Sequence, residues 1–522
     1  MLRSSGVRLF IAGAMSAAAV FGQGGGGVSF RDWTAPAATG KPGISCGELR
    51  GLTSYEYSVI SAVVIRAAGD VPEHCRVSIL VPPTLNVEVN LPTAWNSRLY
   101  MFGNGGFGGE SFEAENRIEN RANALKYGFA VAATDTGHSA ESEPGASFAT
   151  SRQKMVDFGF RSLHVTVELA KLLVHAYYGA APSKSYYDGC SQGGRQGLIF
   201  AQRFPTDFDG ILAGAPGLNQ TGIMLSRAWW MQGWMAAPIP AAKLKVLAQK
   251  VYEQCDAKDG LKDGLIDDPR KCGFQPARDL PRCTAGTDQS DCFTTAQIGT
   301  LERIYSDVKS QGKRFYPGWQ PGSEIAGPNG RSGWIGEMVD GPNGEGTWPR
   351  YAETFLRFMA FPEKDPNYSL SKFDIDKDVS RTTLASQILD ATDPDLSAFQ
   401  RHGGKLIMYF GWADPQLNPM MGVEYYEKVA EKMGSSTGDF FRLYMVPGMF
   451  HCRGGVGTSV FDAATPLVNW VESGKRPEQI IASRVVDKKV DRTRPLCVYP
   501  QVARYQGSGS IDEAKNFTCV KP

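Results

Sequence analysis

Apolar and polar positions follow two different periods along this chain. Short runs of β-branched and aromatic residues alternate with longer stretches of helical spacing, first between residues 58 and 217 and again beyond residue 400. This alternation predicts an α/β fold with a mostly parallel sheet and helices on both faces. Strands are expected at Arg98–Phe102, Tyr127–Ala133, Ser185–Asp188, Phe208–Ala213, Lys405–Phe410 and Phe441–Val446, and helices at Asp157–Tyr178, Arg195–Arg203 and Gly422–Met433.

The middle of the chain, residues 218–399, has a different pattern. It lacks the regular alternation, holds four clustered cysteines and most of the tryptophans, and includes the Gly/Pro-rich stretch PGWQPGSEIAGPNGRSG. We interpret it as a lid domain inserted into a larger fold. Residues 23–217 and 400–522 are then the two parts of one α/β domain, and no internal repeat is found.

The first 22 residues have the composition of a secretory signal peptide. Arg3 and Arg8 give a basic start, Leu9–Phe21 is apolar, and Val20 and Gly22 suit the positions before a cleavage site. A buried N-terminal helix is the alternative, but the glycine run that follows would end it. No later run reaches the ~18 apolar residues of a bilayer-spanning helix, so we expect a secreted or periplasmic protein without a membrane anchor.

Charge balance excludes several classes of partner. The chain has 522 residues, 55 basic and 54 acidic, for a net charge of +1, and 42% of its residues are hydrophobic. A basic surface that would attract nucleic acid or an anionic membrane is therefore not expected. The composition is that of a globular protein, and the length allows two or three folding units or one large domain with an insertion.

The chain has ten cysteines, an even number. In an oxidising compartment this predicts up to five disulfides, and the absence of a Cys-x-x-Cys pair disfavours zinc ribbons and thioredoxin-like motifs. The count alone leaves the connectivity open. The set comprises Cys46, Cys75, Cys190 and Cys452, and three pairs for which short intervening segments make local bonds plausible: Cys255 with Cys272, Cys283 with Cys292, and Cys497 with Cys519.

Three segments match the G-x-S-x-G pattern of a nucleophile elbow, centred on Ser45, Ser191 and Ser436. An elbow requires a strand before the serine and a helix after it, so that a strained turn projects the hydroxyl beyond the sheet edge. Only Ser191, in YDGCSQGG, has both. Ser45 lies in a Pro/Gly-rich segment, and Gly434 has the position of a helix C-cap, which leaves Ser436 in a loop. Ser191 is the candidate nucleophile, with an ordinary tight turn as the alternative.

A serine hydroxyl needs a general base, and the base needs an orienting carboxylate. In α/β-hydrolases both follow the serine in chain order, on loops after late strands. Asp414 in GWADP follows the expected strand 405–410, and His451 in PGMFHC follows the expected strand 441–446. His138 in TDTGH is the strongest rival base, but it precedes Ser191. Asp135 in the same loop is interpreted as structural.

The remaining requirement is an oxyanion hole, formed by backbone N–H groups near the nucleophile. The N–H of Gln192, directly after Ser191, provides one donor. The glycine loop GNGGFGG at residues 103–109 has the place of the second. Gly105 and Gly106 are the best candidates, because a missing side chain lets the backbone approach the developing charge. A phosphate-binding loop is disfavoured, since the G-x-G-x-x-G spacing is missing and no Lys-Ser/Thr follows.

Two cysteines flank the candidate triad, because Cys190 precedes Ser191 and Cys452 follows His451. A triad would bring them close enough to bond. The segments GCSQGG, GWADP and PGMFHC resemble the paired-cysteine triad of the tannase and feruloyl esterase family, as do GNGGFGG, ATDTGH, YDGCSQGGRQGL and FDGILAGAPG. The resemblance covers nearly the whole chain after its first 22 residues. It implies secreted serine esterases with an α/β-hydrolase fold and a large lid, acting on galloyl, feruloyl, chlorogenate or mono(hydroxyethyl) terephthalate esters.

The segment CDAKDGLKDGLIDDP at residues 255–269 repeats aspartates at spacings of three and four, with glycines that permit a tight loop. Such a loop can offer several oxygens to a hard cation, although the EF-hand spacing is missing. A solvated acidic turn is the equal alternative on spacing alone. The resemblance implies a structural calcium ion here. Its ligands would be the side chains of Asp256, Asp259 and Asp263 and the carbonyls of Leu261 and Leu265.

The leading hypothesis is a secreted serine hydrolase of small aromatic-acid esters that works through an acyl-enzyme, with calcium and no organic cofactor. Ser191 would attack the ester carbonyl, His451 would transfer the proton, and Asp414 would fix the histidine tautomer. The alternatives are a serine peptidase on the same fold and a non-catalytic, calcium-stabilised binding protein. Five tryptophans could form an aromatic wall for the acyl ring but are better explained as lid core: Trp229, Trp230, Trp234, Trp319 and Trp334.

Overall fold

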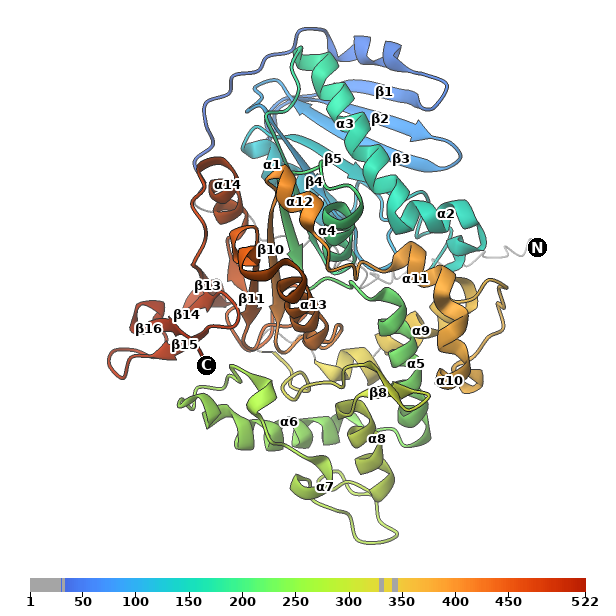
Figure 1. The fold of residues 1–522 in the computed structure, drawn as a ribbon, viewed down its shortest axis with the longest axis vertical. Coiled ribbons are helices and arrows are strands. Elements are labelled where there is room, and N and C mark those ends of the chain that lie inside the picture. The colour runs from blue at the N-terminus through green and yellow to red at the C-terminus, as the bar shows by residue number, and fades with distance from the viewer. Residues whose placement is uncertain (1–29, 31–32, 328–332, 340–345) are drawn as a thin grey trace, which may run out of the picture.

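The computed structural model describes residues 30, 33–327, 333–339 and 346–522, so the expected signal peptide at residues 1–22 lies outside the described residues. A nine-stranded sheet, in the order β1-β2-β3-β5-β4-β6-β7-β10-β11, forms the centre of the molecule (Figure 1). Its strands are β1 (Ser58–Ile65), β2 (His74–Val81), β3 (Leu85–Pro92), β5 (Ala130–Thr134), β4 (Arg98–Phe102), β6 (Lys184–Cys190), β7 (Gly210–Gly214), β10 (Lys405–Gly411) and β11 (Phe441–Val446).

The sheet has a parallel part and an antiparallel part. The strands from β5 to β11 run parallel, as the sequence predicts. At the other edge β1, β2 and β3 form an antiparallel meander that joins β5. The apolar pattern does not reveal this meander, because β1 leaves the apolar residues Ile60, Val63 and Val64 48–56% exposed. Exposed apolar residues hide the period-two alternation that would mark a half-buried strand.

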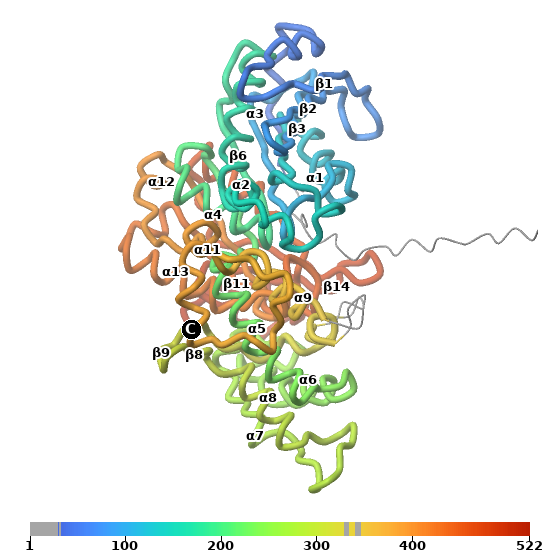
Figure 2. Tube along the Cα trace, turned by 90° about the vertical axis from the view of Figure 1, so that its right-hand side faces the viewer, coloured from blue at the N-terminus to red at the C-terminus, as the bar shows by residue number. Residues whose placement is uncertain are grey.

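Helices cover both faces of the sheet. Figures 1 and 2 show α3 (Ser162–Tyr178), α4 (Gln192–Arg203) and α13 (Pro419–Met433) on one side and α1 (Glu115–Lys126) on the other. The short helix α2 (Arg152–Val156) and a π-helical turn, Asp157–Arg161, lead into α3, so the helix expected from residue 157 begins irregularly. β5 begins three residues later than expected, because Tyr127 ends α1 and Gly128 turns the chain at φ 80°.

The residues between β7 and β10 form a separate layer. In their described part they add no strand to the nine-stranded sheet. Most of them pack beneath it, whereas α12 lies beside α4 (Figure 1). Their core includes Trp230, Trp319 and Trp348, whose ring centroids lie 4.8–5.6 Å apart. This segment contains α5 (Gln220–Ala236), α6 (Ala241–Cys255), α7 (Pro276–Asp279), α8 (Thr295–Tyr305), α9 (Thr347–Phe358), α10 (Ile375–Asp378), α11 (Thr383–Leu389) and α12 (Ser397–His402), with the hairpin β8 (Val308–Ser310) and β9 (Lys313–Tyr316).

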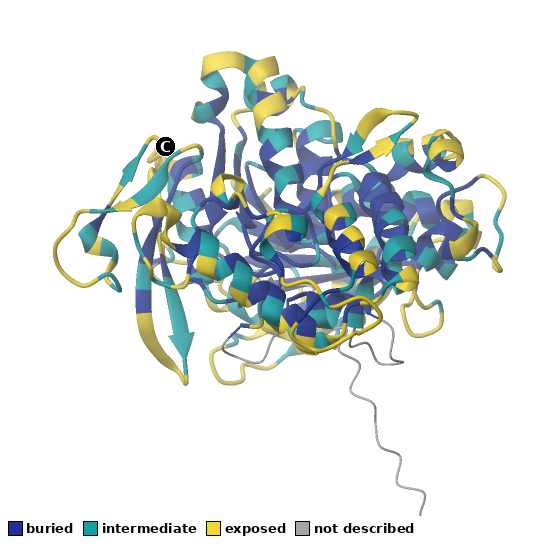
Figure 3. Cartoon of the chain, turned by 90° about the horizontal axis from the view of Figure 1, so that it is seen from below, coloured by how far each residue is buried: buried dark blue, intermediate teal, exposed yellow. Residues whose placement is uncertain are grey.

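Residues 460–522 add elements that the sequence pattern does not predict. Helix α14 (Ala464–Ser473) packs on β7 and β10. The same residues form two small sheets, and Figure 3 shows exposed residues on their outer turns. Their strands are β12 (Val460–Phe461), β13 (Gln479–Val486) and β14 (Lys489–Cys497) in one, and β15 (Val502–Tyr505) and β16 (Phe517–Val520) in the other. None of the described helices has the length and apolar composition that a bilayer crossing requires.

All ten cysteines lie within the described residues, and each is in a disulfide. The three local pairs expected from short spacing are confirmed. The structure pairs the remaining four cysteines as Cys46–Cys75 and Cys190–Cys452, a connectivity that the count leaves open. The bonds are Cys46–Cys75, Cys190–Cys452, Cys255–Cys272, Cys283–Cys292 and Cys497–Cys519.

Candidate active site

Ser191 occupies a sharp turn between β6 and α4. Its backbone has φ 64° and ψ −120°, a conformation that non-glycine residues avoid unless the surroundings enforce it. Two hydrogen bonds do so here, because Ser191 N–H donates to the Gly214 carbonyl at 2.9 Å and the Ser191 carbonyl accepts from Gly217 N–H at 3.1 Å. A Cβ atom on Gly189 would lie 2.6 Å from the Gly193 carbonyl carbon, so the turn tolerates no side chain there. This is the geometry of a nucleophile elbow.

Asp414 and His451 meet on the loops after β10 and β11. Asp414 Oδ2 lies 2.7 Å from His451 Nδ1. Asp414 is fully buried, and its Oδ1 accepts from the backbone N–H groups of Gln416 and Leu417 at 2.8 and 2.9 Å. His451 Nε2 has no hydrogen-bond partner among the described residues, Ser191 included. The carboxylate therefore fixes the ring through Nδ1 and leaves Nε2 available, as a general base requires.

The disulfide Cys190–Cys452 joins the elbow directly to the histidine loop. The two Cα atoms are 6.0 Å apart, although 262 positions separate the residues in sequence. Cys452 has φ 62°, and Ser191, which follows Cys190, has φ 64°. The bond thus ties the residue before Ser191 to the residue after His451.

The glycine loop after β4 packs against the elbow. A Cβ on Gly103 would lie 2.5 Å from Gly193 Cα, which shows how closely the two backbones approach. Within the loop, Gly105 N–H donates to Glu110 Oε1 at 2.5 Å. This N–H is therefore occupied, and of the two glycines expected as oxyanion donors Gly106, at φ 51°, is the one without such a bond among the described residues. Gln192 begins α4, so its N–H has no partner within the helix.

Side chains from the inserted layer reach the aspartate loop. Arg227 of α5 donates from Nη2 to the Gln416 carbonyl at 2.5 Å, and Gln416 Nε2 donates to Glu337 Oε1 at 3.0 Å. Arg227 and Glu337 are 4% and 6% exposed. Burial raises the pKa of Glu337 to about 7, although the Arg227 charge opposes that shift. Glu337 Oε2 has no hydrogen-bond partner among the described residues.

Helix α9 contributes two aromatic side chains to the same region. Trp348 Nε1 donates to the Pro415 carbonyl at 3.1 Å, which ties the helix to the aspartate loop. Tyr351 stacks on Phe107 with 4.9 Å between centroids. A Cβ on Gly106 would lie 2.6 Å from the Tyr351 hydroxyl oxygen, so this tyrosine covers the glycine loop. The inserted layer therefore contacts the loops on both sides of the elbow.

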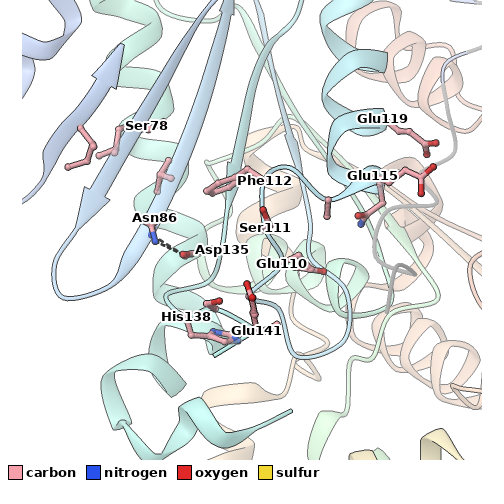
Figure 4. Close-up of a pocket in the computed structure, with 18 of the residues that line it drawn as sticks. Ser78, Asn86, Glu110, Ser111, Phe112, Glu115, Glu119, Asp135, His138 and Glu141 are labelled. Atoms are coloured by element: carbon pink, nitrogen blue, oxygen red, sulfur yellow. Dashed lines mark hydrogen bonds between the residues drawn. The ribbon is translucent and has the colours of Figure 1, made fainter. Parts of the chain in front are cut away.

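Asp135 and His138, the other acid and histidine considered from the sequence, make contacts away from Asp414 and His451. Asp135 accepts from Asn86 and from Gly137 N–H, a set of contacts that holds the β3–β5 connection. His138 stacks on Phe148 at 3.6 Å, and burial lowers its pKa to about 4. Both residues line a cavity of about 940 Å³ beside the glycine loop (Figure 4). The histidine that the structure pairs with Asp414 is His451.

The other two serines of the G-x-S-x-G pattern lack an elbow. Ser45 is exposed and caps a 3₁₀ turn, Cys46–Leu52. Ser436 lies in the 3₁₀ turn Gly434–Asp439 after α13 and accepts a hydrogen bond from Gln400. Gly434 is the C-cap of α13, as its position predicts.

The aspartate-rich loop follows α6 and is closed by the disulfide Cys255–Cys272. Asp256 Oδ1 accepts from the N–H groups of Asp263 and Gly264 at 3.1 and 3.0 Å. Burial, together with repulsion from neighbouring carboxylates, raises the pKa of Asp259 to about 6. Crowded carboxylates in a tight loop are the donor types that a hard cation takes.

The loop is nevertheless not arranged as a closed ligand set. Within the described part of the chain, no three His, Cys, Asp or Glu side chains are grouped as metal ligands. Arg494 Nη2 donates to Asp263 Oδ2 at 2.5 Å and supplies part of the balancing positive charge. The donor chemistry fits calcium, and the ion stays a prediction.

Sequence reasoning did not identify four residues that surround the site: Glu110, Arg227, Glu337 and Tyr351. Each is a single residue without a motif, and three of them belong to the inserted layer. An arginine in a helix that is otherwise largely apolar, QTGIMLSRAWWMQGWMA, is the one signal that could have drawn attention to Arg227. A long, charged side chain on such a helix must find a partner when it is buried.

Comparisons with known proteins agree with this geometry. Residues 70–520 match the family model "Tannase and feruloyl esterase". The chain is 34% identical to the mono(2-hydroxyethyl) terephthalate hydrolase of Piscinibacter sakaiensis, with 88% of this chain and 87% of that protein covered. It is 31% identical to a probable feruloyl esterase B-1 of Aspergillus oryzae, with 85% and 84% covered.

A solved structure supports the same conclusion. The crystal structure of feruloyl esterase B from Aspergillus oryzae matches with a TM-score of 0.79 and 28% sequence identity, covering 90% of this chain and 98% of that chain. The fold is therefore an α/β-hydrolase fold. The chain belongs to the tannase and feruloyl esterase family and is a carboxylic-ester hydrolase.

Proposed function

We propose that this esterase works through a serine nucleophile and an acyl-enzyme. Ser191 Oγ would attack the ester carbonyl while His451 Nε2 takes its proton, and the carbonyl π electrons would move onto the oxygen. Collapse of the tetrahedral intermediate would break the bond to the alcohol oxygen, which receives the proton from His451. Water, activated by the same histidine, would then release the acid and restore Ser191.

The observation that carries this proposal is the Asp414–His451 contact of 2.7 Å on a loop bonded to the elbow by Cys190–Cys452. A buried carboxylate against Nδ1 stabilises the imidazolium that forms during proton transfer. The negative oxygen of the tetrahedral intermediate would lie between the N–H groups of Gln192 and Gly106. Each such donor typically contributes ~10²–10³ in rate.

We also propose that the acyl group is an aromatic acid. The support is the relatives' names and the aromatic and polar side chains, Tyr351, Trp348, Arg227 and Glu337, that the inserted layer brings to the site. The test measures kcat/KM on methyl gallate, methyl ferulate, chlorogenate, mono(hydroxyethyl) terephthalate, an aliphatic ester of equal size and a matched amide. We expect at least a tenfold preference for one aromatic ester over the aliphatic ester. An equal rate on both would contradict the acyl assignment, and faster amide cleavage would indicate a peptidase.

Export to an oxidising compartment is a further part of the proposal. Its support is the signal-like composition of residues 1–22 together with five disulfides. Expression of the full chain, followed by N-terminal sequencing of the protein recovered outside the cytoplasm, tests it. A mature N-terminus near residue 23 is expected, and an unprocessed cytoplasmic protein would contradict it.

A further inference from the structure

The glycine loop that would bind the oxyanion has little stiffness of its own. Residues 103–109 contain five glycines, and Gly106, Gly108 and Gly109 all have positive φ values, from 51° to 77°. Glycine has more backbone freedom than any other residue, so a loop of this kind holds one conformation only where other groups fix it. Catalytic N–H groups must be held within a fraction of an ångström of their productive positions.

Both ends of the loop are fixed by the surrounding fold. Arg117 Nη1 donates to the Gly103 carbonyl at 2.6 Å, and Asn104 N–H donates to Gln196 Oε1 of the nucleophile helix at 3.0 Å. At the far end, Gly109 N–H donates to the Asp135 carbonyl at 3.1 Å. These bonds leave the central residues, Gly105 to Gly108, to be fixed in another way.

Glu110 fixes the centre. Its Oε1 accepts from Gly105 N–H at 2.5 Å, and its Oε2 accepts from Asn104 Nδ2 at 2.9 Å. One carboxylate therefore holds two consecutive residues of the loop that precedes it, and hydrogen bonds to an ionised acceptor are about twice as strong as neutral ones. Gly108 N–H donates to the Gly105 carbonyl at 2.8 Å, so the anchored Gly105 peptide in turn closes the tight turn that contains Gly106.

We infer that Glu110 is a positioning residue for ester hydrolysis, which orients the Gly106 N–H toward the oxyanion by clamping Gly105 and Asn104. The inference rests on the proposed serine mechanism. Glu110 already accepts a hydrogen bond from Gly105 N–H. The N–H group of the loop that would donate to the oxyanion is therefore that of Gly106. Glu110 lines a cavity whose lining includes none of Ser191, Asp414 and His451 (Figure 4), so it would act on the loop and not on the reacting atoms.

A neighbouring carboxylate provides a matched control. Glu141 lines the same cavity as Glu110 and carries the same charge, but it is exposed and makes no hydrogen bond to the loop among the described residues. Glu141→Ala changes the electrostatic potential of the cavity without removing the clamp. A difference between the two variants therefore reports the hydrogen bonds and not the loss of a negative charge.

The test compares wild type, Glu110→Ala, Glu110→Gln and Glu141→Ala on the best ester of the panel. For Glu110→Ala we expect kcat to fall about 10²-fold with KM within about threefold, because an oxyanion donor acts mainly in the transition state. An aryl boronic acid, which forms a tetrahedral adduct with the serine, should lose affinity in parallel. Glu110→Gln keeps an acceptor for Gly105 but faces Asn104 with a second amide, so about tenfold loss is expected. Glu141→Ala should keep wild-type values.

Several results would overturn the inference. These are a wild-type kcat in Glu110→Ala, an equal loss in Glu141→Ala, or a rise in KM with kcat and boronic acid affinity unchanged. If Glu110→Ala does not fold, as judged by thermal melting, Glu110→Gln decides in the same way, and a wild-type rate there refutes the clamp. If wild type itself hydrolyses none of the esters, the proposed function fails, and the inference fails with it.

Discussion

The edge of the parallel sheet and the inserted layer hold their polar groups in different ways. At the sheet edge, both oxygens of Asp414 are bonded, the His451 ring is fixed through Nδ1, and a disulfide joins the two loops. In the inserted layer, one buried oxygen of Glu337 has no partner within the part of the chain that the structure describes. At the sheet edge the open atom among the described residues is His451 Nε2, which proton transfer would use, and the bonds around the ring hold it in place. The proposed mechanism has no such use for the open oxygen of Glu337, and a buried polar atom without a partner is costly unless a ligand pairs with it. We therefore expect the sheet edge to control chemistry and the inserted layer to control selectivity and stability.

Removing the nucleophile should have the largest effect. Ser191→Ala is expected to lower ester turnover by about 10⁴-fold or more, since the residual rate would come from the oxyanion donors and binding alone. Initial rates on the best ester, with thermal melting to verify folding, measure this.

The matched controls for that variant are Ser45→Ala and Ser436→Ala, which remove the serines of the other two G-x-S-x-G segments. Both should retain the wild-type rate, because neither lies in an elbow. Activity of the Ser191 variant comparable to wild type would end the triad assignment.

Separating the two loops should have the next largest effect. The variant Cys190→Ala/Cys452→Ala is expected to lose about 10²-fold in kcat, because a displacement of ~1 Å between Ser191 and His451 is enough for such a loss. Its free energy of unfolding should also fall, by up to ~5 kcal/mol in the chain-entropy model for a loop of this length. Steady-state kinetics and chemical denaturation measure the two effects.

A second disulfide variant tests whether the loss of activity is specific to the Cys190–Cys452 bond. Cys283→Ala/Cys292→Ala removes a bond in the inserted layer that closes a segment of nine positions. It should keep the wild-type kcat. If both double variants lose the same activity, the Cys190–Cys452 bond has no special part in positioning the triad.

The residues of the proposed triad could be selected from the sequence because each has a local signature. A strand, a turn and a helix surround Ser191, and the loops after β10 and β11 each carry one polar residue of the required type. Boundaries were less accurate where local rules compete, as at Tyr127, where a turn at Gly128 ends α1 before β5 begins. The meander β1–β3 was missed because exposed Ile60, Val63 and Val64 disguise its alternation.

The residues around the triad could not be predicted in the same way. Arg227, Glu337 and Tyr351 come from three separate segments of the inserted layer, and only tertiary packing brings them together. Glu110 was missed for another reason: glycine spacing indicates an oxyanion loop but not which N–H group is free. The sequence favoured Gly105 and Gly106 equally, and a side chain five residues further along distinguishes them.

Glu337 should give the inserted layer a pH-dependent stability. Burial raises its pKa from 4.5 to about 7, so between these values the folded protein binds a proton that the unfolded chain has released. Stability conferred by this group therefore falls as pH rises from about 4.5 to 7. The free energy of unfolding of Glu337→Gln should depend less on pH. Relative to wild type it should rise by up to ~3 kcal/mol between pH 4.5 and pH 8, at about 1.4 kcal/mol per pKa unit. Denaturation at a series of pH values measures it.

The exposed residue Glu363 of the same layer offers the control. Glu363→Gln should follow the wild-type pH profile of unfolding free energy. A Glu337→Gln profile parallel to wild type would show that Glu337 does not titrate as its burial beside Arg227 requires. The kcat/KM ratios of the ester panel in the same variant indicate whether Glu337 also affects selectivity.

The smallest expected effect concerns the aspartate loop after α6, for which we propose a structural calcium ion. Three crowded carboxylates repel one another, and a bound cation would remove that repulsion in the folded state only. Chelation should lower the melting temperature by a few degrees, since ~1 kcal/mol corresponds to roughly 2–4 °C in a domain of 150–250 residues. kcat should change less than about twofold after calcium is restored.

Asp259→Ala should abolish the fall in melting temperature on chelation. Asp291→Ala, which replaces an exposed aspartate of the same layer, should keep it. Identical melting of the calcium-loaded and chelated wild type would rule out the ion, and would mean that Arg494 and Arg492 balance the charge of Asp263 without it.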